Sequence, residues 1–280
     1  MLTAGLAAIL IVGGGGFLLG QRAGEAPAPI AALPAPVAAP PPAATVAPPR
    51  SLARADLVTL ANAAADAVAG GTALPADLSD AVGKRFVLAL PFGCDGPAAA
   101  DSDAAMRWRY DEKAQALRLH VAPVDWDPAD WWEEAPAEVE AIEGFWIERP
   151  WTSSETCPAA ARPSAARGPQ AVILPGQSLA IAQFFGREGA RQGRRNGKAY
   201  NSVVRLAPES VQADRGFRLR LTGHIAAAPD GGPVICRQPG GAAQRPVCAI
   251  AATLDEVAIE NPTTGETLAT WAVAASRGME

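Results

Sequence analysis

Short segments in which hydrophobic and polar residues alternate fill most of the chain beyond residue 84. They are rich in strand-forming residues and are bounded by Gly, Pro, Asp or Asn, a pattern typical of β-strands. The segments with this pattern are 84–92, 105–110, 116–121, 144–150, 171–175, 178–185, 201–206, 217–225, 247–254, 256–261 and 267–273. Many short strands with few helices favour an antiparallel β-sandwich or a barrel-like domain, so we expect a mainly-β fold.

Two connections between these segments predict tight hairpins. In residues 260–271 (ENPTTGETLATW), Gly265 is suited to the positive φ that a short turn requires. Residues 109–119 (RYDEKAQALRL) have the same organisation, with a polar turn between two alternating segments.

One amphipathic helix is predicted over residues 51–70, at the start of the domain. Ser51 is a candidate N-cap, and Gly70 and Gly71 end the helical pattern. The apolar residues at helical spacing are Leu57, Leu60, Ala61, Ala64 and Val68. We expect this helix to pack on the β domain, with an independent partner-binding helix as the alternative.

The first residues of the chain form an apolar segment that carries no charged side chain from Met1 to Gly20. About 20 helical residues span roughly 30 Å, the thickness of a bilayer core, so residues 1–21 predict a transmembrane anchor. A cleaved secretory signal peptide is the alternative, although no basic residue precedes the apolar run. The later Ala26-Pro27-Ala28 sequence is followed by Pro29, a poor context for cleavage.

Residues 22–50 form a linker rich in proline and alanine. Proline at this density favours an extended polyproline II conformation and acts as a semi-rigid spacer. We therefore expect a domain over residues 51–280 that stands away from a membrane surface.

The four cysteines all follow the predicted anchor. An even number of cysteines in an exported chain indicates disulfides, whereas a zinc site would more often show a C-x-x-C pair. Cys236 and Cys248 flank a Gly/Pro-rich loop and are expected to pair across a hairpin, which leaves Cys94 to pair with Cys157. Free buried cysteines, a metal clip and a catalytic thiol are the alternatives. The disulfide interpretation predicts a periplasmic or extracellular domain.

Three of the predicted strands combine an apolar face with a cationic face. Alternation places Met106, Trp108 and Tyr110 opposite two arginines, and the same pattern recurs in 116–121 and 217–225. The candidate binding residues are Arg107, Arg109, Arg118, His120, Arg218, Arg220 and His224. If the three strands share one sheet, their cations gather on one surface that suits an anionic partner such as a lipid headgroup, an acidic glycan or a protein. The alternatives are separate solvated faces, or shielding by acidic residues of the same chain.

An acidic segment, residues 125–143, carries eight carboxylates and no Lys or Arg, and five tryptophans lie in it or just after it. Paired carboxylates beside aromatic side chains are also found in glycoside hydrolases, and closely spaced Asp residues in calcium sites. The simpler interpretation is a solvated acidic loop held by its tryptophans, and the segment is also the candidate shield for the cationic strands. A second charged loop, residues 186–200, has Arg187, Arg191, Arg194, Arg195 and Lys198.

Composition and motifs narrow the functional classes. The net charge of −5 gives no reason to expect nucleic-acid binding. The chain has no P-loop, dinucleotide fingerprint, H-E-x-x-H motif or G-x-S-x-G elbow, and we expect no cofactor. The sequence therefore favours a membrane-anchored, extracytoplasmic binding or assembly module without enzymatic activity. A hydrolase of envelope glycans that uses the acidic segment is the alternative.

Overall fold

A computed structural model describes residues 50–158, 178–186 and 193–273. The predicted anchor over 1–21, the linker up to residue 49 and the predicted strand 171–175 lie outside these residues. None of the helices in the described ranges has the length and apolar content that a bilayer crossing requires.

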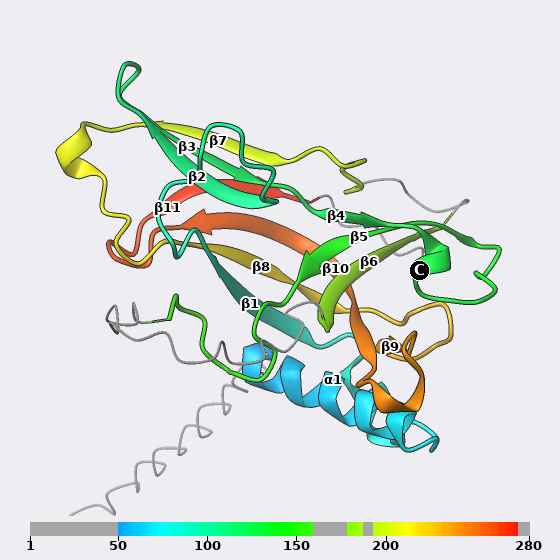
Figure 1. Ribbon diagram of the computed structural model, residues 1–280. Coiled ribbons are helices and arrows are strands. Elements are labelled where there is room, and N and C mark those ends of the chain that lie inside the picture. The colour runs from blue at the N-terminus through cyan, green and yellow to red at the C-terminus, as the bar shows by residue number, and fades with distance from the viewer. Residues whose placement is uncertain (1–49, 159–177, 187–192, 274–280) are drawn as a thin grey trace, which may run out of the picture. The chain divides into compact units, whose positions relative to one another are not determined.

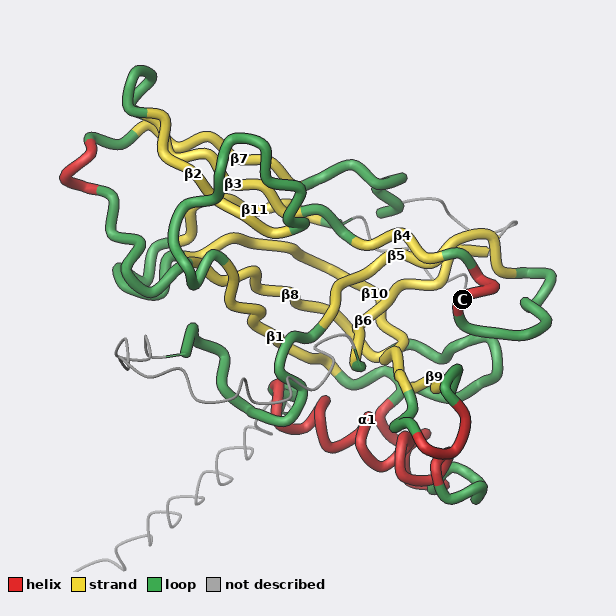
Figure 2. The backbone as a smooth tube through the Cα atoms, viewed as in Figure 1, coloured by secondary structure: helices red, strands yellow, loops and turns green. Residues whose placement is uncertain are grey.

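The described residues form two β-sheets with one α-helix, as the strand patterns predict (Figures 1 and 2). The larger sheet contains β1 (Arg85–Phe92), β4 (Val124–Trp126), β5 (Val139–Trp146), β6 (Leu179–Gly186), β8 (Phe217–Ile225), β9 (Val234–Arg237), β10 (Val247–Glu260) and β11 (Thr267–Ala272). The smaller sheet contains β2 (Met106–Asp111), β3 (Ala116–Val121) and β7 (Tyr200–Arg205). In the described part of the chain the larger sheet ends at β1 and β4 and does not close into a barrel.

Strand β10 organises the larger sheet because its two halves have different partners. Residues 247–251 pair with β9 and β6, whereas residues 252–260 pair with β8 and, from Glu256 onward, also with β11. The β6–β10 pair is parallel, whereas the other pairs of this sheet are antiparallel. The two strands predicted at 247–254 and 256–261 are one strand, with a register shift between Leu254 and Glu256.

Both predicted hairpins are present. Strand β10 pairs with β11 through a turn in which Gly265 has φ 75°, and β2 pairs with β3 through a turn in which Gln115 has φ 45°. Strand β7 adds to the other side of β3, so that β3 is the central strand of the smaller sheet.

Helix α1 (Arg54–Ala69) confirms the predicted helix, but its cap differs from the prediction. Ala53, not Ser51, occupies the N-cap position, and the Asp56 carboxylate accepts its backbone N–H at 2.8 Å. Leu52 instead pairs with the edge of β1, which draws the chain before the helix into strand-like contact with the sheet. Short 3-10 helices occur at η1 (Ala76–Ala81), η2 (Pro128–Asp130), η3 (Pro208–Ser210) and η4 (Gly241–Ala243).

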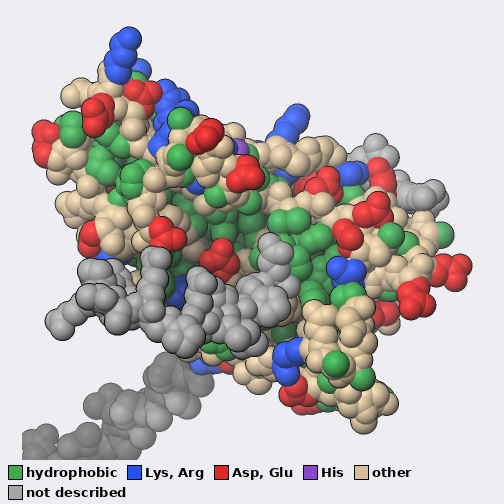
Figure 3. Space-filling view, in the orientation of Figure 1, with side chains coloured by type: hydrophobic (Ala, Val, Ile, Leu, Met, Phe, Trp, Pro, Cys, Tyr) green, Lys and Arg blue, Asp and Glu red, His purple; other side chains and the backbone are tan. Residues whose placement is uncertain are grey.

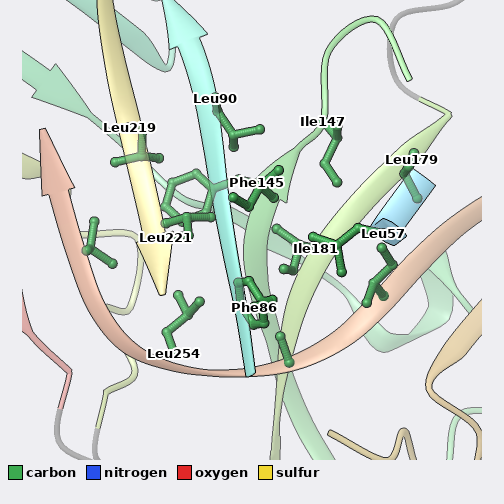
Figure 4. Close-up of a cluster of buried hydrophobic side chains, with 14 of the residues drawn as sticks. Leu57, Phe86, Leu90, Phe145, Ile147, Leu179, Ile181, Leu219, Leu221 and Leu254 are labelled. Atoms are coloured by element: carbon green, nitrogen blue, oxygen red, sulfur yellow. The ribbon is translucent and has the colours of Figure 1, made fainter. Parts of the chain in front are cut away.

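The main core lies between the larger sheet, the smaller sheet and α1. Figure 4 shows Leu57 of α1, Phe86 of β1 and Ile181 of β6 pointing into one apolar cluster, and all three are almost fully buried. The smaller sheet joins this core through its inner face, where the Trp108 and Phe217 rings form a T-shaped pair with their centroids 5.5 Å apart. Burying a large apolar side chain stabilises the fold by roughly 1.5–3 kcal/mol, so this shared core holds the two sheets together.

Both predicted disulfides are present. Cys236 and Cys248 are directly opposed on β9 and β10, with Cα atoms 4.1 Å apart. Cys94 and Cys157 join the connection after β1 to the segment after β5, with Cα atoms 5.4 Å apart. These two bonds indicate an oxidising, extracytoplasmic compartment.

Candidate functional site

The outer face of the smaller sheet gathers the predicted cations of β2 and β3. Cross-strand pairing forms two adjacent rows on this face: Arg107, His120 and Asn201 in one, and Arg109, Arg118 and Val203 in the other. Residues directly opposite in an antiparallel pair have Cβ atoms about 5 Å apart, so the side chains of these two rows are neighbours. Figure 3 shows basic side chains along the upper edge of the view, over this sheet. We call this surface the cationic face.

The three arginines of the cationic face differ in how far they are neutralised. Arg118 forms an ion pair with Asp111 at 3.0 Å, whereas an Arg107 nitrogen donates to the backbone oxygen of Ala104. In the described part of the chain, no hydrogen bond or ion pair involves the exposed side chain of Arg109. Asp111 is thus the carboxylate that pairs with an arginine on this face, and Arg107 and Arg109 have no ion pair among the described residues.

Asp111 is held in place by its own turn as well as by arginine. The backbone N–H of Ala114 donates to its carboxylate at 3.0 Å, and Arg118 donates to the other oxygen. The Ala114 hydrogen bond first, and then Arg118, hold the pKa of the Asp111 carboxyl below its usual range. The carboxylate therefore stays charged under ordinary conditions, and it forms its ion pair with Arg118, while Arg109 acts on it only at longer range.

His120 presents one ring nitrogen to its neighbour and leaves the other available. Its Nδ1 lies 2.8 Å from the Asn201 side-chain oxygen, and the Asn201 amide nitrogen donates to the backbone oxygen of Ala199. Because an amide oxygen only accepts, Nδ1 carries the proton in this arrangement, and Nε2 is left to interact with a ligand or solvent.

A cavity of about 300 Å³ lies on the cationic face, beneath the segment that connects β1 to β2. Ala98, Ala99 and Ala100 form its wall, and it is also lined by Arg107, Arg109, Arg118, His120, Asn201 and Val203. None of the described residues that line it carries a carboxylate. Val203 is 57% exposed, so the cavity combines guanidinium groups with an apolar border.

Three local features hold this wall, residues 94–105, which we call the strap. The Cys94–Cys157 disulfide fixes its beginning, and the Ala98 N–H donates to the Trp108 backbone oxygen at 2.8 Å. Gly93, just before it, has φ 64°, and a Cβ there would come within 2.3 Å of the Trp108 ring. Only glycine fits this approach, which lets the Trp108 Nε1–H donate to the Gly93 oxygen.

The cations of β8 lie elsewhere, which corrects the expectation of a single surface. Arg218, Arg220 and His224 belong to the larger sheet, although β8 has the predicted alternation of buried and partly exposed residues. Alternation determines which face of a strand a side chain occupies, but not which sheet the strand joins.

Carboxylates of β10 neutralise these β8 cations. Arg218 pairs with Glu260 at 3.1 Å, Arg220 pairs with both Glu256 and Glu260, and His224 Nδ1 lies 3.2 Å from Asp255. Burial alone would lower the pKa of the Arg220 guanidinium, but Glu260 and then Glu256 outweigh this effect and raise it. This face of the larger sheet is therefore charge-balanced.

No protein-family model, curated protein or solved structure matches this chain.

The acidic segment has a structural arrangement that differs from the predicted loop. It forms β4, η2 and the first half of β5. Trp126 and Trp131 are buried in a second apolar cluster, and the partly buried Trp146 packs against them. Among the described residues, the carboxylates that pair with the β8 cations come from β10, and Arg118 pairs with Asp111, so the ion pairs of these cations do not come from the acidic segment. No cluster of potential metal ligands is found among the described residues.

Glu143 has the clearest function within the acidic segment. It is 2% exposed, and its two carboxylate oxygens accept the backbone N–H groups of Arg195 and Asn196 at 2.7 and 2.6 Å. Arg194 pairs with Glu140 at 3.0 Å beside it. These contacts hold the charged loop before β7 against β5, which gives Glu143 a positioning role.

Several residues of the site were missed by the sequence analysis. Asp111 follows Arg107 and Arg109 in the same alternation, so its place on the cationic face was available from the pattern. Asn201 and Val203 come from β7, which only the sheet pairing brings beside β3. Ala98–Ala100 carry no local signal, because their position depends on the disulfide and on Gly93.

Proposed function

We propose that this protein is a membrane-anchored, extracytoplasmic binding module that holds an anionic component of the cell envelope on its cationic face. The observation that carries the proposal is the cavity beneath the strap, where the described lining residues include three arginines and no carboxylate. Arginine offers a planar fork of donors that pairs well with carboxylate and phosphate groups.

The contrast between the two sheets supports this assignment. On β8 and its neighbours, each arginine has a carboxylate within 4 Å, as Arg85 has in Asp255 at 3.9 Å. On the cationic face, like charges occupy directly opposite positions in Arg109 and Arg118, an arrangement that costs stability. An anionic partner would offset that cost, whereas solvent requires no arginine at these positions.

The proposal also assigns roles to the residues before the domain, the predicted anchor and the linker. An apolar segment over residues 1–21 would hold the protein in a membrane, and the linker over 22–50 would separate the domain from it. Fractionation of the full chain tests this part. It should remain with membranes after alkaline carbonate washing, and release of the intact chain would contradict an anchor.

The test of the binding function uses the full-length protein and two anionic probes, vesicles of anionic lipid and polygalacturonate, each at low and at high salt. Replacing Arg107 and Arg109 together by Ala should weaken binding by about tenfold or more, because each lost charged hydrogen bond is worth roughly 1.5–3 kcal/mol. Binding should also become less sensitive to salt.

Arg85→Ala is the matched control, because Arg85 is an exposed arginine on the larger sheet. It should leave binding unchanged. Equal binding by the double variant and by the native chain would overturn the proposal, as would an equal loss in the control.

A further inference from the structure

We infer that the cavity beneath the strap is a site for a phosphomonoester group. The inference deepens the proposed function and rests on it. It starts from the arrangement of the three guanidinium groups around a space of limited volume.

Three neighbouring positions on the outer face of β2 and β3 carry arginine: Arg107, Arg109 and Arg118. Arg107 and Arg109 are two residues apart on β2, which separates them by roughly 7 Å, and Arg118 lies directly opposite Arg109, about 5 Å away between Cβ atoms. An arginine side chain is long enough to cover these separations. One small group above the sheet can therefore receive donors from all three.

A tetrahedral dianion fits this arrangement better than a single carboxylate. A phosphomonoester presents three terminal oxygens and carries a charge of about −1.5 to −2 at neutral pH, which matches several donors arriving from different directions. A carboxylate has two oxygens in one plane and one charge, and a single arginine fork satisfies it.

The wall of the cavity selects for a group at the end of a molecule. The strap covers one side with three alanines, and Val203 borders the other side. A phosphodiester carries a substituent on two of its oxygens, and both substituents would have to leave a space of about 300 Å³. A terminal phosphate carries only one, and the apolar border accepts the carbon atoms that follow it.

The titration of the ligand supplies a readout that a carboxylate would not give. The second pKa of a phosphomonoester is about 6, so its affinity for the site should rise between pH 5 and pH 7. A carboxylate is fully ionised over that range. His120 also lines the cavity. His120→Gln therefore isolates the contribution of the ligand.

The experiment measures calorimetric binding of inorganic phosphate, glycerol 3-phosphate and glucuronate to the full chain in detergent, at pH 5 and pH 7. We expect both phosphates to bind at one site per chain, to bind more tightly than glucuronate, and to gain affinity at pH 7 in the native chain and in His120→Gln. Arg109→Lys should weaken phosphate binding at least fivefold because it removes the fork, and Arg85→Ala should not.

The source of the phosphate is distinguished with vesicles. Vesicles that contain phosphatidic acid, a phosphomonoester lipid, should bind more tightly than vesicles with an equal fraction of phosphatidylglycerol, a phosphodiester. Tighter binding to phosphatidic acid than to glycerol 3-phosphate identifies a lipid headgroup as the source, and equal binding identifies a soluble phosphate.

Two results would overturn the inference in distinguishable ways. If glucuronate or phosphatidylglycerol binds as tightly as its phosphomonoester counterpart, the assignment to a phosphomonoester fails while the anion-binding function stands. If none of the soluble anions or vesicles binds at low salt, both fail together.

Discussion

Asp111 limits the positive charge of the cationic face, so its replacement should strengthen anion binding, whereas replacing an arginine should weaken it. Asp111→Asn removes the carboxylate that pairs with Arg118 and keeps a side-chain oxygen for the Ala114 N–H. We expect anion binding to become tighter by a few-fold, because the variant removes the negative charge beside the site and frees the Arg118 N–H groups that Asp111 holds in the native chain. A calorimetric titration with the same anion measures this change. Weaker binding in the variant would show that Arg118 must be held by Asp111 in order to act.

The same substitution should change how stability depends on pH. The pKa of Asp111 is lower in the folded chain than its usual value, through Ala114 first and then Arg118. The stabilisation that results is complete above the unfolded pKa and is lost as the pH falls through the folded one. The native chain should therefore exceed Asp111→Asn in unfolding free energy at neutral pH, and the difference should shrink below about pH 4. Urea denaturation at pH 3 and pH 7 compares the two chains, and a constant difference would contradict the assignment.

A second prediction at the residue scale concerns the contribution of Glu143 to folding stability. Glu143→Ala leaves two backbone N–H groups without their acceptor and Arg194 without one of its two carboxylates. We expect a loss of about 3 kcal/mol in unfolding free energy, since breaking a buried charged interaction costs roughly 3–5 kcal/mol. Glu138→Gln, an exposed carboxylate on the same segment, is the control and should change stability by less than about 0.5 kcal/mol. Equal, small losses would show that the loop before β7 is held by other contacts.

At the scale of elements, the two disulfides should contribute differently to stability and to binding. They join residues 12 and 63 positions apart, so the chain-entropy estimate gives losses of about 3 kcal/mol for Cys236→Ser with Cys248→Ser and about 4 kcal/mol for Cys94→Ser with Cys157→Ser. Only the second pair holds the strap over the cavity. We therefore expect anion affinity to fall in that variant and to persist in the other, as measured by calorimetry below the unfolding transition. If the variant without the Cys94–Cys157 disulfide bound the anion as tightly as the native chain, the strap would not contribute to the binding site.

Local patterns predicted the elements of this fold better than their assembly. The β2–β3 and β10–β11 hairpins were predicted because their strands are joined by short turns, as at Gly265. Two other pairings, the parallel pairing of β6 with β10 and the antiparallel pairing of β7 with β3, join distant parts of the chain. The local alternation of apolar and polar residues carries no information about such pairings. For the same reason β8, whose pattern resembles that of β3, was expected beside it and lies in the other sheet. The cationic face was thus half predictable, through Arg107, Arg109, Arg118 and His120.

At the scale of the whole molecule, charge is distributed between the two sheets in opposite ways. Arg85, Arg218 and Arg220 on the larger sheet are matched by Asp255, Glu256 and Glu260. The smaller sheet has one carboxylate, Asp111, among its outward-facing arginines. A chain with a net charge of −5 therefore presents a local positive surface, and this surface is attached to the rest of the domain by an apolar core.

That core also predicts how much of the chain the fold requires. Residues 51–280 retain Leu52, whose backbone pairs with β1, and the buried Leu57 of α1. Of the described residues they lose only Arg50, whose pairing with Asp56 is largely exposed and is worth at most about 1 kcal/mol. We therefore expect this fragment, expressed under oxidising conditions, to unfold in a single cooperative transition, and its unfolding free energy to lie within about 1 kcal/mol of the full chain. A fragment that begins at residue 70 lacks α1 and the apolar contacts of Leu57, so it should unfold at markedly lower urea concentration. Loss of the cooperative transition in the 51–280 fragment would show that the residues before the domain belong to its folded structure.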